Sequence, residues 1–147
     1  MKIFLDRIQV QTSKSAEFLD VTDKVLEVLK KAGIRNGFVN IMPLHTTTSV
    51  YLGELGGVLV DDVKAFLERL VASYDWYRHN SAEFSDCERR NAASHIRALL
   101  LGSNTLTLQV CKGELILGEH QRIIFAELDG PRTRRTLQIQ AVGEVGE

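Results

Sequence analysis

The fold class is decided by three neighbouring stretches: TLTLQV (105–110), GELILGEHQRIIFAELDG (113–130) and RRTLQIQAVGE (134–144). Their runs of β-branched and other apolar residues, separated by Gly and Asp-Gly-Pro turn signals, predict three or four strands. No segment with the length and spacing of a helix lies between them. The sequence therefore predicts an α+β fold, without the regular β-α-β alternation of a doubly wound sheet.

The elements before residue 105 complete this architecture. Strands are expected at 2–12, 37–44 and 45–54, and helices at 20–33 and 58–72, with a shorter third helix at 91–102. In the first helix, apolar residues recur at helical spacing, and Gly33 follows as a typical left-handed stop. We expect a single compact domain over 1–147, in which mixed, mainly antiparallel sheets pack against two main helices and a shorter third helix.

Composition limits the function classes. The 147 residues are 44% hydrophobic and 25% charged, with 18 Lys and Arg against 19 Asp and Glu. This excludes a disordered chain and argues against binding nucleic acid. No apolar run approaches the roughly 20 residues that span a membrane, and Asp6 and Arg7 stand where a signal peptide is apolar. Because Cys87 and Cys111 form no disulfide framework, we expect a cytoplasmic protein without a membrane partner.

Four histidines, His45, His79, His95 and His120, are the main candidates for chemistry. His79 lies in SYDWYRHNSAEFSDCERR (73–90), a stretch without clear periodicity whose length inside a compact domain indicates a functional loop. None of the four has a local ligand spacing, so each also has a plain structural interpretation. His95 fits a half-buried imidazole bonded to a carbonyl, His45 a turn residue, and His120 an exposed hairpin position.

A second candidate is FAELDGPRTRR (125–135). The Asp-Gly-Pro turn brings Arg132, Arg134 and Arg135 close together, and clustered guanidinium groups suit phosphate or pyrophosphate. Alternating Arg and Thr on a solvated strand is the more common explanation of such a pattern. Glu127, just upstream, fits a metal ligand, a general base or a surface carboxylate.

Three motifs in the same order, HTTTSV (45–50), YRHNSAEFSDCERRNAASHIRALLLG (77–102) and GELILGEHQRIIFAELDGPR (113–132), resemble the YjbQ-like family, also called secondary thiamine-phosphate synthase. The resemblance covers nearly the whole chain. It implies a YjbQ-like fold and a homotrimer. Some members of the family show weak thiamine-phosphate synthase activity, which joins a hydroxymethylpyrimidine diphosphate to a thiazole phosphate and releases pyrophosphate.

The resemblance also implies a site. His45, His79, His95 and Glu127 match family residues that converge on one cleft. Three imidazoles with an open fourth position are typical of catalytic zinc, so we expect His45, His79 and His95 to bind a divalent metal, zinc in particular. The expected catalytic residues are His79, His95 and Glu127. A small phosphorylated or anionic ligand is expected to contact Thr46, Thr47, Asn80, Arg132 and Arg134.

The sequence departs from the family pattern twice: Gly53-Glu54 replaces Asn-Glu, and Gly118-Glu119-His120-Gln121 replaces Gly-Thr-Trp-Gln. Both changes bear on substrate specificity and leave the three histidines intact. Three functions stay open at this point. The chain is an enzyme acting on a phosphorylated small molecule, a metal- or anion-binding trimeric module with incidental synthase activity, or a structural trimer whose histidines bind nothing.

Overall fold

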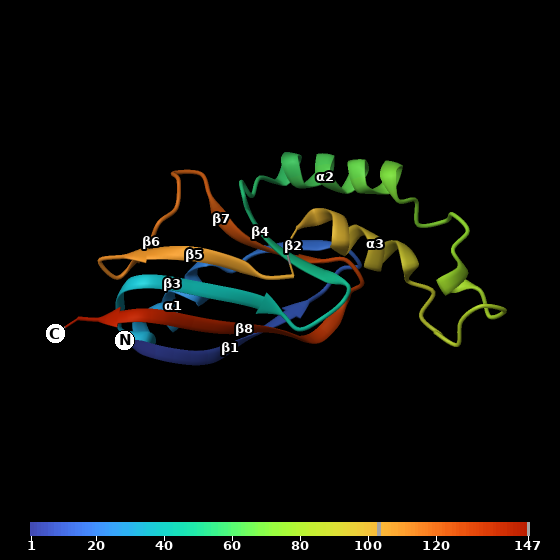
Figure 1. The fold of residues 1–147 in the computed structure, drawn as a ribbon. Coiled ribbons are helices and arrows are strands. Elements are labelled where there is room, and N and C mark those ends of the chain that lie inside the picture. Colours follow the sequence, from blue (N-terminus) through green and yellow to red (C-terminus); the bar gives the residue numbers. More distant parts are fainter. Residues whose placement is uncertain (103, 147) are drawn as a thin grey trace.

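The computed structural model describes residues 1–102 and 104–146, so residues 103 and 147 of the expected domain lie outside the described part. Its elements follow one another irregularly, as the sequence predicts (Figure 1). They are β1 (Lys2–Thr12), β2 (Glu17–Asp20), α1 (Thr22–Ala32), β3 (Ile34–Pro43), β4 (Thr48–Gly53), α2 (Gly57–Leu70), the 3-10 turn η1 (Arg78–Asn80), α3 (Ala92–Leu101), β5 (Leu106–Cys111), β6 (Glu114–Leu115), β7 (Arg122–Glu127) and β8 (Arg132–Val145).

The strands form two sheets that face each other. One sheet has the order β1-β8-β3-β5-β6 and the other the order β2-β7-β4. Every strand pairing in the described residues is antiparallel. The expected α+β class, with antiparallel sheets and three helices, is confirmed.

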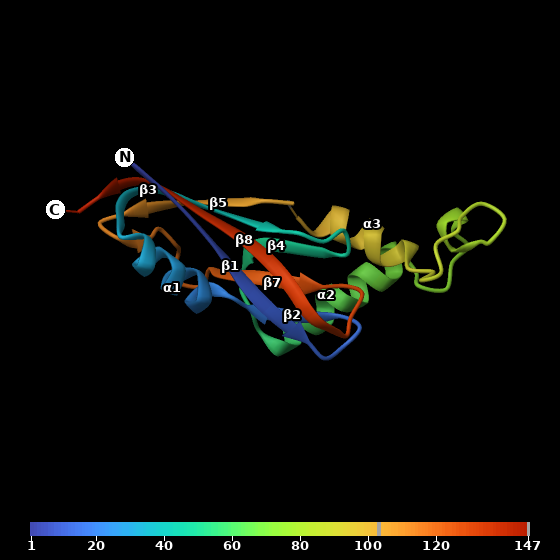
Figure 2. The same cartoon turned by 90° about the horizontal axis from the view of Figure 1, so that it is seen from below.

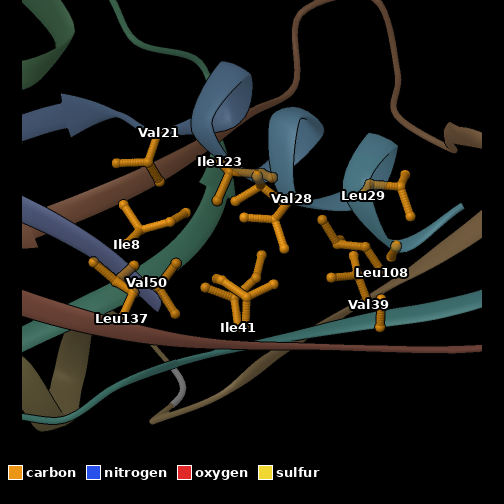
Figure 3. Packing of buried hydrophobic residues seen from close by; sticks show 14 of the residues in the cluster. Ile8, Val21, Val28, Leu29, Val39, Ile41, Val50, Leu108, Ile123 and Leu137 are labelled. Atoms are coloured by element: carbon orange, nitrogen blue, oxygen red, sulfur yellow. The ribbon is translucent and has the colours of Figure 1, made fainter. Parts of the chain in front are cut away.

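The main core fills the space between the two sheets. Strand alternation turns Ile41 of β3 and Leu137 of β8 inward from the larger sheet, while Phe125 of β7 faces them from the smaller one, and all three are fully buried. Helix α1 adds Val28 and Leu29 from its apolar face (Figure 3). This packing fixes the ends of the strands, where the polar residues described below lie.

Helices α2 and α3 lie on the other face of the smaller sheet (Figures 1 and 2). They contribute Leu67 and Ala98 to a second buried cluster, whose sheet residues include Ile124 and Ala126. Much of the two helices stays uncovered: Phe66, for example, is 53% exposed. None of the helices in the described residues is long and apolar enough to cross a membrane.

The helices begin and end near their expected residues. Gly33 adopts the left-handed conformation (φ 66°) that ends α1, as its sequence predicts. Asp20 accepts a hydrogen bond from the Thr22 amide at 2.9 Å and so caps the start of α1. The short strand β2 is not among the predicted elements, because its four residues, EFLD, show no alternation that separates a strand from a loop.

Candidate functional site

Apart from His120, which precedes β7, the candidate residues come from one end of the sandwich, where β3 turns into β4 and β7 turns into β8. The segment that joins α2 to α3, residues 71–91, extends from this same end (Figures 1 and 2). We call this segment the arm. Apart from η1 it contains no helix or strand, as its sequence predicts.

The arm brings His79 against His95, which lies in the first turn of α3. The two ring centroids are 5.0 Å apart and the ring planes are tilted by 59°. Both side chains are half-buried. Two imidazoles at this separation are able to contact one small ligand together, and histidine is the side chain best suited to move protons near neutral pH.

Asn80 joins the arm to the start of α3. Its Oδ1 accepts a hydrogen bond from the Ala92 amide at 3.0 Å, and it lies 3.4 Å from Nδ1 of His79. Asn91 occupies the N-cap position, but its side chain makes no capping bond. It donates instead to Oδ2 of Asp129 in the β7–β8 turn at 2.8 Å. Asn80 therefore takes over the capping, and Asn91 anchors α3 to the sandwich.

Glu127 and Arg135 form a buried ion pair beneath this surface. Nε of Arg135 lies 2.7 Å from Oε2 of Glu127, and Nη2 lies 2.6 Å from Oε1. Glu127 also accepts hydrogen bonds from the Thr12 hydroxyl and the Asp129 amide, each at 2.9 Å. Glu127 is fully buried and Arg135 nearly so. The carboxylate thus receives two hydrogen bonds on each oxygen.

This environment decides the charge and the role of Glu127. Burial alone raises the pKa of its carboxyl group, but hydrogen bonds from Arg135, the Asp129 amide and Thr12, with the charge of Arg135, outweigh burial and hold the pKa below its usual value. Since both oxygens are buried and fully bonded, Glu127 does not reach a ligand. The geometry therefore assigns it to holding Arg135 and the β7–β8 turn, while the expected catalytic role stays a prediction.

His45 lies in the β3–β4 turn with its Nε2 accepting a hydrogen bond from the Thr136 amide at 2.8 Å. An accepting Nε2 is unprotonated, so the proton of the neutral ring is on Nδ1. Burial lowers the pKa of His45, and the charge of Arg135 lowers it further, against a smaller opposite effect of Glu127. His45 is therefore neutral at pH 7 and offers an N–H donor.

The expected three-histidine metal set is not assembled within one chain. Among residues 1–102 and 104–146, no group of three or more His, Cys, Asp or Glu side chains is placed to hold a metal ion. The reason at His45 is chemical, because Nε2 uses its lone pair on Thr136 and Nδ1 carries the proton. His79 and His95 remain as a pair, one ligand short of the three that catalytic zinc sites use.

The expected anion contacts differ in their surroundings. Thr46 is exposed, whereas Thr47 is buried and accepts a hydrogen bond from Nη2 of Arg135 at 2.9 Å. Arg132 donates to Oδ2 of Asp129 at 2.8 Å and to the Pro131 carbonyl at 3.1 Å. Arg134 is exposed. Strand alternation separates Arg134 from buried Arg135, so the three arginines do not form the single cluster that their sequence suggests.

Two of the site's structural residues were not predicted as such. Thr12, the last residue of β1, donates a hydrogen bond to Glu127 and accepts one from the Arg132 amide, each at 2.9 Å. Asp129 accepts hydrogen bonds from both Asn91 and Arg132, whereas its sequence context predicts only a turn. Alternation along β8, which places residues 135, 137 and 139 on one face, is the sequence signal that identifies Arg135 as inward-facing. His120 is exposed, as expected, but it lies in the connection between β6 and β7, which belong to different sheets, and not in a hairpin.

Comparison with known sequences gives relatives over the full length. A UPF0047 protein of Methanothermobacter thermautotrophicus is 37% identical, with 98% of this chain and 95% of the relative covered. The UPF0047 protein YugU of Bacillus subtilis is 34% identical, with 95% of this chain and 99% of the relative covered.

Solved structures share the fold. A YbjQ-like protein of unknown function from Sulfolobus solfataricus superposes with a TM-score of 0.88 at 31% identity, over 97% of this chain and 99% of that one. A hypothetical protein from Aeropyrum pernix gives 0.85 at 33% identity, over 96% and 99%. The family model described as UPF0047 protein YjbQ-like matches residues 6–144. With this match, relatives of about the same length and the shared fold, the chain belongs to the YjbQ-like UPF0047 family.

Proposed function

We propose that the chain is an enzyme that binds a small phosphorylated molecule at the end of the sandwich and transfers part of it, with thiamine-phosphate synthesis as the candidate reaction. The observation that carries this proposal is the apposition of His79 and His95, whose ring centroids lie 5.0 Å apart beside the start of α3. Such a half-buried pair is a suitable place to hold a phosphate oxygen and to deliver a proton to it.

In the candidate reaction a carbon–nitrogen bond forms between the pyrimidine methylene group and the thiazole nitrogen. The carbon–oxygen bond to pyrophosphate breaks, and pyrophosphate leaves with the electron pair. His79 or His95 in its protonated form donates to the leaving oxygen, while Arg134 and Thr46, both exposed at this end, supply further donors. Stabilising the charge that develops on the leaving group is the main contribution expected of such a site.

We also propose that a divalent metal binds at the His79–His95 pair with the help of ligands from outside the single chain. His79 and His95 offer two imidazoles, so further ligands have to come from the substrate or from another copy of the chain.

We also propose that the chain forms a homotrimer. Its support is the exposed apolar surface of α2 and α3, where Phe66, Leu70 and Leu99 are 53%, 56% and 71% exposed. Sedimentation equilibrium and metal analysis of untagged protein test the two points separately.

One observation favours a second candidate function, a binding module with only incidental turnover. Glu127, one of the expected catalytic residues, is enclosed by Arg135, Thr12 and the Asp129 amide, so its carboxylate is not free to act as a base. An anion-binding protein needs donors and no base.

Pyrophosphate release from the two thiamine-phosphate precursors separates the two functions. An enzyme releases pyrophosphate in proportion to product, and His79→Gln and His95→Gln lower kcat while the matched variant His120→Gln does not. A binding module takes up the phosphorylated precursor without turnover. Absence of both binding and turnover in the wild-type protein would overturn the proposal.

A further inference from the structure

Arg97 ties α3 to the first residues of the arm. It lies two positions after His95, and its side chain is only 13% exposed. Its Nε donates to the Val71 carbonyl at 3.0 Å, and its Nη2 donates to the Ser73 hydroxyl at 3.0 Å. Residues two apart on an α-helix point roughly 200° away from each other. Arg97 therefore contacts the arm on a different side of α3 from His95.

Glu68, near the end of α2, completes this contact. Its Oε2 lies 2.5 Å from Nη2 of Arg97, and its two oxygens accept hydrogen bonds from the amide and the hydroxyl of Ser73, each at 2.8 Å. The Ser73 amide, the Ser73 hydroxyl and Arg97, in that order, lower the pKa of Glu68 to about 2. The carboxylate is thus ionised throughout the neutral range. We call Arg97, Glu68 and Ser73 the arm clamp.

A second contact between the arm and α3 lies beside His79. Asn80 accepts a hydrogen bond from the Ala92 amide at 3.0 Å, and the Tyr77 hydroxyl donates to the Ala72 carbonyl at 2.8 Å. The stretch between Ser73 and Asn80 is thus fixed to α3 at both ends, by Arg97 and by the first helical amide. His79 lies inside this stretch, and His95 lies on the helix to which both ends are fixed.

We propose that Arg97 is a positioning residue for the His79–His95 pair: by holding the start of the arm on α3, it sets the separation of two imidazoles that it does not itself touch. The proposal deepens the proposed function, which gives the pair its purpose. The clamp uses a planar donor fork with several simultaneous acceptors, which lysine does not reproduce in full.

The test compares Arg97→Met with the matched control Arg69→Met, an exposed arginine on α2. The wild-type protein without ligand is expected to give a nuclear Overhauser cross-peak between the ring protons of His79 and His95. Arg97→Met is expected to lose this cross-peak while the core resonances stay in place, Arg97→Lys to regain part of it, and Arg69→Met to keep it. Affinity for pyrophosphate is expected to fall by about tenfold in Arg97→Met only, as expected for a displaced contact group.

A full cross-peak in folded Arg97→Met would overturn the proposal. If that variant does not fold, Glu68→Gln replaces it, because this change removes the charge of the clamp at a half-buried position and keeps the side-chain length. A weakened cross-peak in Glu68→Gln supports the clamp, and an unchanged one contradicts it. The cross-peak is recorded without ligand. Failure of the proposed function would instead appear as wild-type protein that does not bind pyrophosphate at all.

Discussion

Arg135 binds Glu127 through two parallel hydrogen bonds, from Nε to Oε2 at 2.7 Å and from Nη2 to Oε1 at 2.6 Å. Arg135 belongs to β8 in the larger sheet and Glu127 to β7 in the smaller one. The pair therefore joins the two sheets at the end of the sandwich where the apolar core stops. It also lies beside His45, because both charges affect the pKa of that histidine.

Replacing Arg135 with Met is expected to destabilise the protein by about 3–5 kcal/mol, because it leaves a buried carboxylate without its counter-charge. Urea unfolding at neutral pH measures the change. Arg134→Met is the matched control, since Arg134 is exposed on the same strand, and its expected effect is within about 0.5 kcal/mol. The double variant Arg135→Met/Glu127→Leu is expected to recover a large part of the loss. Equal effects of the two arginine variants would contradict the assigned role of the ion pair.

His45 is expected to make stability depend on pH. Its pKa is lowered in the folded state by burial and by Arg135, so the unfolded chain binds its proton more readily. The contribution of His45 is fully present above the unfolded pKa of about 6.5 and is lost as the pH falls through the folded pKa.

The variant His45→Gln keeps an acceptor for the Thr136 amide and does not titrate. Urea unfolding at about pH 7.5 and about pH 5.5, on either side of the ordinary histidine pKa, is expected to show a larger loss on acidification for the wild-type protein than for the variant. Equal losses would show that His45 is not the group responsible.

Asn80 is expected to stabilise the start of α3. Asn80→Ala removes the acceptor of the Ala92 amide and is expected to cost about 1 kcal/mol, as the loss of a helix cap does. Asn80→Asp keeps an acceptor oxygen and adds a charge that the helix N-terminus favours. Thermal unfolding is expected to rank Asn80→Ala below both Asn80→Asp and the wild-type protein. Equal unfolding temperatures of Asn80→Ala and Asn80→Asp would rule out this capping role.

Local sequence signals were enough for most of the fold. Gly33 ends α1 because a left-handed residue is needed there, and the strands after residue 105 follow from their apolar runs. The sequence does not predict the short strand β2, because it is the tertiary pairing with β7 that makes these four residues a strand. The length of the segment between α2 and α3, together with its aromatics and histidine, predicted a functional loop, and the same segment brings His79 to His95.

The site itself was less accessible to sequence reasoning. The sequence shows which residues are present, but it does not show which of their atoms are already engaged in hydrogen bonds within the fold. The tautomer of His45 depends on the Thr136 amide of β8, and the state of Glu127 depends on Arg135 and Thr12, which are distant in the chain. A match of three histidines to a family pattern therefore suggested a metal set that a single chain does not assemble.

The central claim is that His79 and His95 together contact a phosphorylated ligand. Its most direct test is a titration of the wild-type protein with pyrophosphate, followed through the imidazole nitrogen resonances of all four histidines at constant pH. The account predicts that the resonances of His79 and His95 shift together and saturate at one common ligand concentration, while those of exposed His120 do not move. Saturation with both resonances unmoved, or no binding at all, would contradict it.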